Sequence, residues 1–427
     1  MRFLILHVVK PGESLYSISK LYGVDMSKII KDNEMMNPNN LVVGQTIVVL
    51  EGLRKHKVMP GQSLYSIGKF YGVNTKDLLS ANPDLGNVLM PGQVINIPDK
   101  TKKLGTIEVN GYAFPNIDMN VLMKTLPNLT YLSIFSYEVR RDGTLKEIND
   151  LPLINEAKKL RVAPLMVISN IEEGKGFSSD IAHEILTNNV IQNKLIENVV
   201  NVLKEKSYYG LDVDFEYIYP YDRENYIKFL RKMNERLKPL GYTLTVALAP
   251  KTSGEQKGLL YEAHDYPSIG KYVSHVILMT YEWGYTYGPA MAVAPINEVK
   301  KVLSYAVTAI PPNKILLGIP NYGYDWTLPF VQGSAAKTLS NTGAVELARM
   351  VKAAIKYDKE SESPFYNYYD GNGKQHEVWF EDARSILAKL LLVNKYNLGG
   401  VSYWTIGRYF PQNWLVLRAL YDVKKVL

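Results

Sequence analysis

Eight short β-rich runs alternate with helix-like segments over residues 105–427, and this alternation restricts the fold more than any other feature of the sequence. Segments with a helical period, such as residues 188–206 and 223–237, separate most of the runs. Eight strands that alternate with helices favour a (β/α)8 barrel. The runs are TIEVNGYAF, TYLSIFSYEV, VAPLMVISN, YYGLDVDFEY, TLTVALAP, HVILMTYEW, KILLGIPNYG and GGVSYWTI.

The barrel region is longer than the roughly 250 residues that such a barrel needs, so we expect an insertion. Residues 327–381, between the seventh and eighth strands, are the expected place. They contain one helical stretch and the run YNYYDGNGKQHEVWFE, in which Asp370-Gly371 predicts a hairpin turn. The insertion is therefore expected to be a small α+β element.

The front of the chain contains an internal repeat. VVKPGESLYSISKLYGV (residues 8–24) recurs as KVMPGQSLYSIGKFYGV, 49 residues further on. Each copy predicts strand, helix, helix and strand, with Ser14 and Ser63 as helix N-caps and Gly23 and Gly72 as left-handed C-caps. We therefore expect two small βααβ modules, at residues 1–50 and 54–99, and the polar stretch DKTKKL as the linker to a domain over residues 105–427.

The repeated motif PG-[DEQ]-[ST]-L-Y-x-I and the ending GQ-x-I resemble the LysM module. This resemblance implies binding of glycans that contain N-acetylglucosamine, such as peptidoglycan or chitin, with residues 37–42 and the first strand–helix loop of each copy at the groove. A copy that serves only as a spacer is the alternative. The implied glycan-binding residues are Gly12, Glu13, Ser14, Leu15, Gly61, Gln62, Ser63 and Leu64.

Composition limits the chemistry. The chain has no cysteine, which excludes disulfides, thiolate nucleophiles and cysteine metal sites. Of the net charge of +7, the first 103 residues supply most, with 13 Lys and Arg against 8 Asp and Glu. This excess favours an anionic partner or simply a lysine-rich surface. No run approaches the roughly 18 apolar residues of a membrane span, and MRFLILHVVKPGES is a poor signal peptide.

Three acids occupy alternate positions of the apolar run YYGLDVDFEYIY: Asp212, Asp214 and Glu216. On a strand they would share one face, roughly 6–7 Å apart, with Glu216 nearest the C-terminal end of the barrel, where barrel active sites lie. Crowded carboxylates raise one another's pKa, as general acid catalysis requires. A solvated edge strand and a divalent-metal cluster are the alternatives. No loop with further metal ligands accompanies these acids, so a metal site is not expected.

GLDVDFE resembles the D-x-D-x-E signature of the family 18 glycoside hydrolases. LMTYEWG, GIPNYGYDW and GGVSYWTIG are similar to that family's sixth, seventh and eighth strands. The resemblance implies a retaining mechanism in which the substrate's own 2-acetamido group attacks C1, and it implies that no cofactor is needed. Glu216 would be the acid and base, and Asp214 would hold the acetamido N–H. Asp212 would tune Asp214, Tyr281 would donate to the acetamido oxygen, and Trp404 would form the floor beneath the sugar.

The sequence departs from many chitinases at three places. Tyr209 stands where an acid often precedes the motif, Glu282 replaces an aspartate on the sixth strand, and the third strand ends VISN without Ser-x-Gly-Gly. The last two differences weaken a specificity for chitin. We expect Asn170, Glu282, Tyr217 and Trp404 to bind substrate.

The order of two LysM modules and a family 18 barrel resembles the spore cortex-lytic N-acetylglucosaminidases of endospore-forming bacteria. This resemblance implies cleavage after N-acetylglucosamine in cortex peptidoglycan, in the spore or otherwise at the cell wall. Peptidoglycan strands would then be the partner of a monomeric protein, and we expect no nucleic acid and no membrane span. A chitinase or chitooligosaccharide hydrolase is one alternative, and a non-catalytic glycan-binding barrel is another.

Overall fold

The computed structural model describes residues 3–51, 54–86, 88–97 and 103–427. The chain divides into two compact units, one of Met1–Gly105 with Pro411–Tyr421 and one of Thr106–Phe410 with Asp422–Leu427. Within the described residues, no helix is long and apolar enough to cross a membrane.

The first repeat folds as expected. Strand β1 (Phe3–Val8) pairs antiparallel with β2 (Thr46–Glu51), and helices α1 (Leu15–Tyr22) and α2 (Met26–Asn33) lie between them in sequence. Ser14 accepts from Ser17 N in a capping box, and Gly23 ends α1 at φ 64°. Its core consists of Val9, Leu15, Ile18, Ile29, Ile47 and Val49.

The second repeat has the same elements. Strand β3 (Arg54–Lys57) pairs antiparallel with β4 (Val94–Ile97) around helices α3 (Leu64–Tyr71) and α4 (Thr75–Ser80). Ser63 forms the equivalent capping box, and Gly72 ends α3 at φ 66°. Two βααβ modules are thus confirmed, with the capping residues that the repeat predicted.

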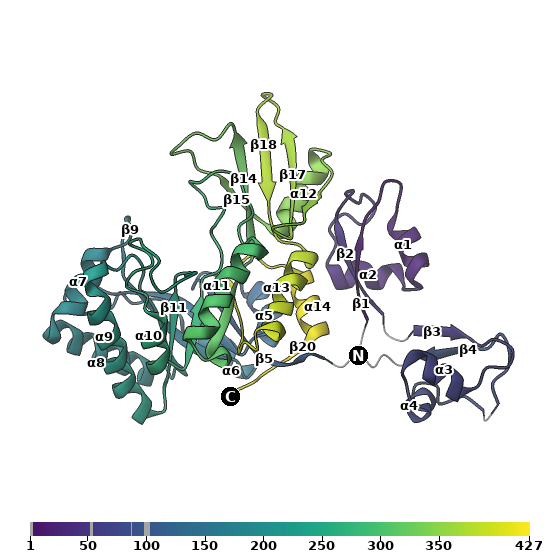
Figure 1. Cartoon of the computed structure of the whole chain (residues 1–427), viewed down its shortest axis with the longest axis horizontal. Helices are drawn as coiled ribbons and strands as arrows, with labels where there is room; N and C mark the ends of the chain where they lie inside the picture. The colour runs from purple at the N-terminus through teal and green to yellow at the C-terminus, as the bar shows by residue number, and fades with distance from the viewer. Residues whose placement is uncertain (1–2, 52–53, 87, 98–102) are drawn as a thin grey trace. The chain divides into compact units, whose positions relative to one another are not determined.

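The second unit contains a closed parallel barrel (Figure 1). All eight strands lie on the runs predicted from the sequence, and β19 pairs with β5 to close the ring. The strands are β5 (Gly105–Ala113), β6 (Tyr131–Glu138), β7 (Ala163–Ser169), β10 (Gly210–Asp214), β11 (Thr243–Leu248), β12 (His275–Leu278), β13 (Ile315–Pro320) and β19 (Gly400–Trp404).

Helices follow the strands around the barrel, and several begin with a side-chain cap. Helix α9 covers the predicted residues 223–237, and its buried face carries Tyr226, Phe229, Leu230, Met233 and Leu237. The helices of the chain from β5 onward are α5 (Met119–Thr125), α6 (Leu151–Lys159), α7 (Ser179–Thr187), α8 (Asn189–Glu205), α9 (Arg223–Leu237), α10 (Tyr266–Tyr272), α11 (Ile296–Ala309), α12 (Asn341–Met350), α13 (Ala383–Lys395) and α14 (Pro411–Leu420).

The expected α+β insertion between the seventh and eighth barrel strands is present. It is a five-stranded antiparallel sheet with helix α12, and its first strand begins at Tyr322, two residues after the end of β13 and earlier than the expected residue 327. Asp370 accepts from the backbone N–H groups of Asn372 and Lys374 in the turn that joins β17 to β18. In sheet order the strands are β15 (Lys337–Ser340), β14 (Tyr322–Leu328), β18 (Gln375–Trp379), β17 (Ser363–Tyr369) and β16 (Lys356–Asp358).

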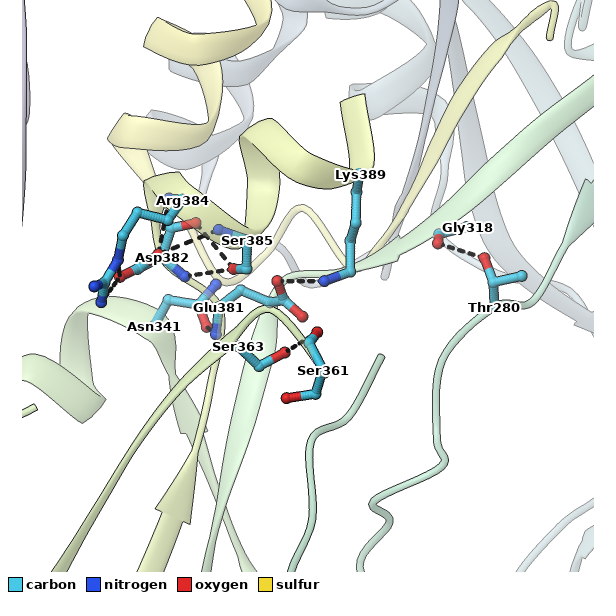
Figure 2. A network of polar contacts seen from close by, with 10 residues as sticks. All are labelled: Thr280, Gly318, Asn341, Ser361, Ser363, Glu381, Asp382, Arg384, Ser385 and Lys389. Carbon is cyan, nitrogen blue, oxygen red and sulfur yellow. Dashed lines mark hydrogen bonds and ion pairs between the residues drawn. The ribbon is translucent and has the colours of Figure 1, made fainter. Parts of the chain in front are cut away.

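A buried ion pair lies where the insertion returns to the barrel (Figure 2). Lys389 of α13 donates to Glu381 at 2.9 Å, and each side chain is only 1% exposed. Asn341 Oδ1 accepts from Glu381 N, and the neighbouring Asp382 caps α13. This network fastens the end of the insertion to a barrel helix.

Candidate active site

The acids of β10 stand in the barrel interior, above a layer of apolar side chains. Alternate positions of the strands point inward, which places Tyr112, Phe135, Val167 and Ile277 in one cluster with Trp404 packed against it. Asp212 is fully buried and Asp214 is 4% exposed. Two buried carboxyl groups in such a setting require hydrogen-bond partners or protons.

Two hydroxyls donate to Asp212. Tyr112 OH lies 2.7 Å and Ser133 Oγ 3.1 Å from Asp212 Oδ2, whereas Asp212 Oδ1 has no partner among the described residues. Burial raises the pKa of Asp212 to about 6, although both hydrogen bonds act to lower it. Asp212 therefore changes its charge near neutral pH and is shielded from the cleft.

Asp214 and Glu216 face the cleft. Burial, followed by the charges of Glu216 and Asp212, raises the pKa of Asp214 well above its ordinary value, and Asp214 Oδ1 has no partner within the described residues. Burial and the charge of Glu282 raise the pKa of Glu216 to about 7. A carboxyl with that pKa can donate a proton and take one back near neutral pH.

Strand β10 ends at Asp214, two residues before Glu216. Its last partner is Ser169 of β7, so Glu216 lies just beyond the ladder of the sheet. Tyr217 follows with φ 53°, a left-handed value that is uncommon for a residue with a side chain. Tyr217 is 41% exposed and lines the cleft, and the sequence predicted it as a substrate contact.

Tyr281 reaches the same cavity from the residues after β12. Its pKa is raised well above normal by burial and then by Asp214 and Glu216, so its hydroxyl stays protonated and can donate. Gly318 of β13 makes room for it, because a Cβ there would lie 2.9 Å from the Tyr281 ring. Thr280 Oγ1 donates to Gly318 O at 2.7 Å and so holds the segment before Tyr281 against β13 (Figure 2).

Glu282 is held by the insertion. Tyr322 OH and Tyr324 OH donate to its carboxylate, the latter at 3.0 Å. Burial raises the pKa of Glu282, and these two hydrogen bonds oppose that rise. Glu282 lines the cleft together with Glu216, and the sequence predicted it as a substrate contact.

Trp404, the last residue of β19, forms part of the aromatic floor of the cleft. It packs edge-on against Phe135 and Tyr112, with ring centroids 4.9 Å and 5.3 Å apart. Apolar faces of this kind stack on sugar rings.

Asn170, which the sequence predicted as a substrate contact, does not lie at the cleft surface. It is fully buried and does not line the cleft. Its side-chain amide bonds to the backbone of Glu216 and Ser178, which leaves no group of Asn170 for a sugar. The sequence carried no signal that Asn170 would bind the backbone of Glu216. It also carried no signal that Tyr112 and Ser133 would donate to Asp212, or that Tyr322 and Tyr324 would donate to Glu282.

The cleft has a volume of about 880 Å³ and combines carboxyls with aromatic rings. No lysine or arginine is among the described residues that line it, although Asp214, Glu216, Glu282 and Glu298 are. In the described part of the chain, no group of three or more His, Asp or Glu side chains is placed to hold a metal ion. The aromatic lining residues are Tyr112, Phe114, Phe135, Phe177, Tyr217, Tyr261, Tyr281, Trp283, Tyr285 and Trp404.

In the two modules, most predicted glycan-binding side chains serve the fold. Ser14 and Ser63 cap helices, and Leu15 is buried. Glu13 Oε2 lies 2.8 Å from His7 Nε2, and Gln62 Oε1 lies 2.7 Å from His56 Nε2. Gly12 and Gly61 lie in the turns before these helices with φ 82°, a left-handed value that suits glycine.

Comparison with known proteins identifies the family of the chain. The model of glycosyl hydrolases family 18 matches residues 107–408, and the LysM domain model matches residues 7–50 and 56–98. The chain therefore belongs to glycosyl hydrolase family 18 and is a glycoside hydrolase that carries two LysM domains.

Individual relatives match along the whole chain. The cortical fragment-lytic enzyme of Bacillus cereus is 43% identical over 98% of both chains, and that of Bacillus subtilis (strain 168) is 41% identical over 98% of this chain and 99% of its own. The crystal structure of the spore cortex-lytic enzyme SleL of Bacillus megaterium QM B1551 covers 100% of both chains at 41% identity, with a TM-score of 0.90. A Chromobacterium violaceum chitinase matches 73% of this chain and 98% of its own at 25% identity, with a TM-score of 0.69.

Proposed function

We propose that the protein hydrolyses the glycosidic bond after N-acetylglucosamine in spore cortex peptidoglycan, at the spore or the cell wall. The observation that carries this proposal is the column of Asp212, Asp214 and Glu216, in which Glu216 meets the cleft with a pKa of about 7. Similarity to cortical fragment-lytic enzymes over 98% of the chain supports cortex as the polymer.

The proposed mechanism is retaining and assisted by the substrate, an exception to the scheme with two catalytic carboxylates. Glu216 gives its proton to the glycosidic oxygen as the bond from C1 to that oxygen breaks. The carbonyl oxygen of the substrate's 2-acetamido group attacks C1 and forms an oxazolinium ion. Water then attacks C1, Glu216 takes the water proton, and the acetamido group is restored.

The neighbouring groups have separate proposed roles. Asp214 accepts the acetamido N–H and stabilises the positive charge, while Asp212 modulates the charge of Asp214. The hydroxyl of Tyr281 donates a hydrogen bond to the acetamido oxygen, and Trp404 supports the sugar from below. Glu282 and Tyr217 are proposed to contact the substrate, and the LysM turns to hold glycan strands.

The first experiment replaces the proposed acid. Glu216→Gln keeps the shape of the side chain but cannot donate the proton, so kcat on soluble cortex fragments should fall on the order of 10²- to 10⁴-fold. Binding of the fragments should remain within about threefold, as measured by isothermal titration calorimetry. Turnover at the unsubstituted rate would refute the assignment of Glu216.

The second experiment identifies the polymer. Mass spectrometry of the products from cortex, vegetative peptidoglycan and chitin is expected to show N-acetylglucosamine at the new reducing end, with cortex as the best substrate. A reducing-end muramic sugar would contradict the specificity for N-acetylglucosamine. Faster cleavage of chitin than of cortex would favour the chitinase alternative.

A further inference from the structure

The segment Phe215–Tyr217 lies beyond the end of β10, and side chains from other elements hold its backbone. The ladder between β10 and β7 stops at the pair Asp214 and Ser169. In a continued sheet, the next backbone groups would pair with each other. Here the side chain of Asn170, the residue after Ser169, takes that place.

Asn170 forms a two-point clamp on Glu216. Its Oδ1 accepts from Glu216 N at 2.9 Å, and its Nδ2 donates to Glu216 O at 2.8 Å. Nδ2 also donates to Ser178 O at 3.0 Å. An asparagine side chain carries the same donor and acceptor as a peptide group, so it can substitute for the missing rung of the ladder.

His264 and Ser179 hold the residues on either side. His264 Nδ1 accepts from Ala249 N at 2.8 Å, so its proton lies on Nε2, which donates to Phe215 O at 3.1 Å. Burial lowers the pKa of His264 to about 4, and the ring is neutral near neutral pH. Ser179 Oγ donates to Tyr217 O. Three successive carbonyl groups around Glu216 are therefore fixed.

We propose that Asn170 is a positioning residue for the acid–base step. By fixing the backbone of Glu216, Asn170 directs the Glu216 carboxyl at the glycosidic oxygen. This inference rests on the proposed function of Glu216. A displacement of about 1 Å at a reacting group can cost on the order of 10²-fold in rate. The clamp also keeps water away from the peptide group behind Glu216, and burial is the main cause of the raised Glu216 pKa.

The test compares pH profiles of kcat and KM on soluble cortex fragments. Asn170→Ala removes both points of the clamp, and kcat should fall on the order of 10²-fold while KM stays within about twofold. Because water gains access to the Glu216 segment, the basic limb of the profile should move to lower pH. An unchanged kcat with an unchanged basic limb would overturn the proposal.

Asn170→Asp keeps the shape of the side chain and serves as the second variant. Its new carboxyl has a donor and an acceptor when protonated, and it loses the donor when ionised. The deficit in kcat relative to the unsubstituted enzyme should therefore be small in acid and grow about tenfold or more as pH rises. A deficit that is constant across pH would contradict the clamp, even if Asn170→Ala fails to fold.

The chain offers a matched control. Asn82 makes the same clamp in the second LysM module, where it accepts from Asn96 N and donates to Asn96 O, both at 2.6 Å. Asn82→Ala should leave kcat and the pH profile on soluble fragments unchanged. Glu216→Gln is assayed in parallel. If it remains active, the function of Glu216 fails, whereas an inactive Glu216→Gln with a fully active Asn170→Ala rejects only the positioning role.

Discussion

Asp212, Asp214 and Glu216 share one run of sequence but meet different surroundings. Asp212 accepts hydrogen bonds from the hydroxyls of Tyr112 and Ser133 through Oδ2, and Oδ1 of both Asp212 and Asp214 has no partner among the described residues. Glu216 lies past the strand end, where the charge of Glu282 acts on it. Each of the three carboxyl groups therefore has its own proton affinity, because burial and neighbouring groups differ from one position to the next.

The charge of Glu282 can be tested through the pH profile. Glu282→Gln removes a negative charge that raises the pKa of Glu216, so Glu216 loses its proton at lower pH. The basic limb of kcat/KM should start near pH 7 in the unsubstituted enzyme and move down on the order of one unit in the variant. Gln keeps an oxygen that can accept from Tyr322 and Tyr324.

The matched control is Glu298→Gln. Glu298 lines the same cleft, but its charge is not among the causes that raise the pKa of Glu216. The basic limb of the kcat/KM profile of the Glu298→Gln variant should coincide with that of the unsubstituted enzyme. If both variants shift the limb equally, the general charge of the cleft and not Glu282 sets the pKa of Glu216.

At the scale of elements, the sequence predicts what depends on local pattern. The eight barrel strands and both modules followed from alternation and repetition. The spacing of the three acids predicted a shared strand face, and β10 contains two of them, Asp212 and Asp214. The end of β10 and the clamp on Glu216 could not be predicted. Asn170 and Glu216 are 46 residues apart, and whether an amide serves a backbone or a sugar depends on partners that only the folded chain brings together.

The buried ion pair of Glu381 and Lys389, where the insertion returns to the barrel, gives a prediction on stability. Lys389→Met leaves Glu381 buried without its cation, and the free energy of unfolding should fall by about 3–5 kcal/mol. The double variant Glu381→Leu/Lys389→Met removes both charges and should recover most of this loss. Chemical denaturation followed by tryptophan fluorescence measures both, and an equal loss in both variants would mean that packing and not the lone charge is responsible.

An ion pair on the surface serves as the control for the buried ion pair of Glu381 and Lys389. Lys159 contacts Glu156 at 2.7 Å on the surface of α6. Lys159→Met should change the free energy of unfolding by less than about 1 kcal/mol, since exposed ion pairs contribute little.

At the scale of the whole molecule, the two parts of the chain carry different charge. The first 103 residues have an excess of five positive charges, while the described residues that line the cleft include four carboxyls and no cation. An anionic wall would be attracted by the front of the chain and not by the cleft. This difference favours a division of work, in which the LysM modules hold the polymer and the barrel cuts it.

Removal of residues 1–103 tests that division. Two modules on one polymer raise the effective concentration of the barrel, so their loss should lower the rate on insoluble cortex by about tenfold or more. On soluble fragments, which diffuse to the cleft, kcat/KM should stay within about twofold. Release of reducing sugar measures both rates, and thermal unfolding checks that the truncated barrel is folded. Equal losses on both substrates, with an unchanged midpoint of unfolding, would show that the modules serve catalysis itself and not attachment to the wall.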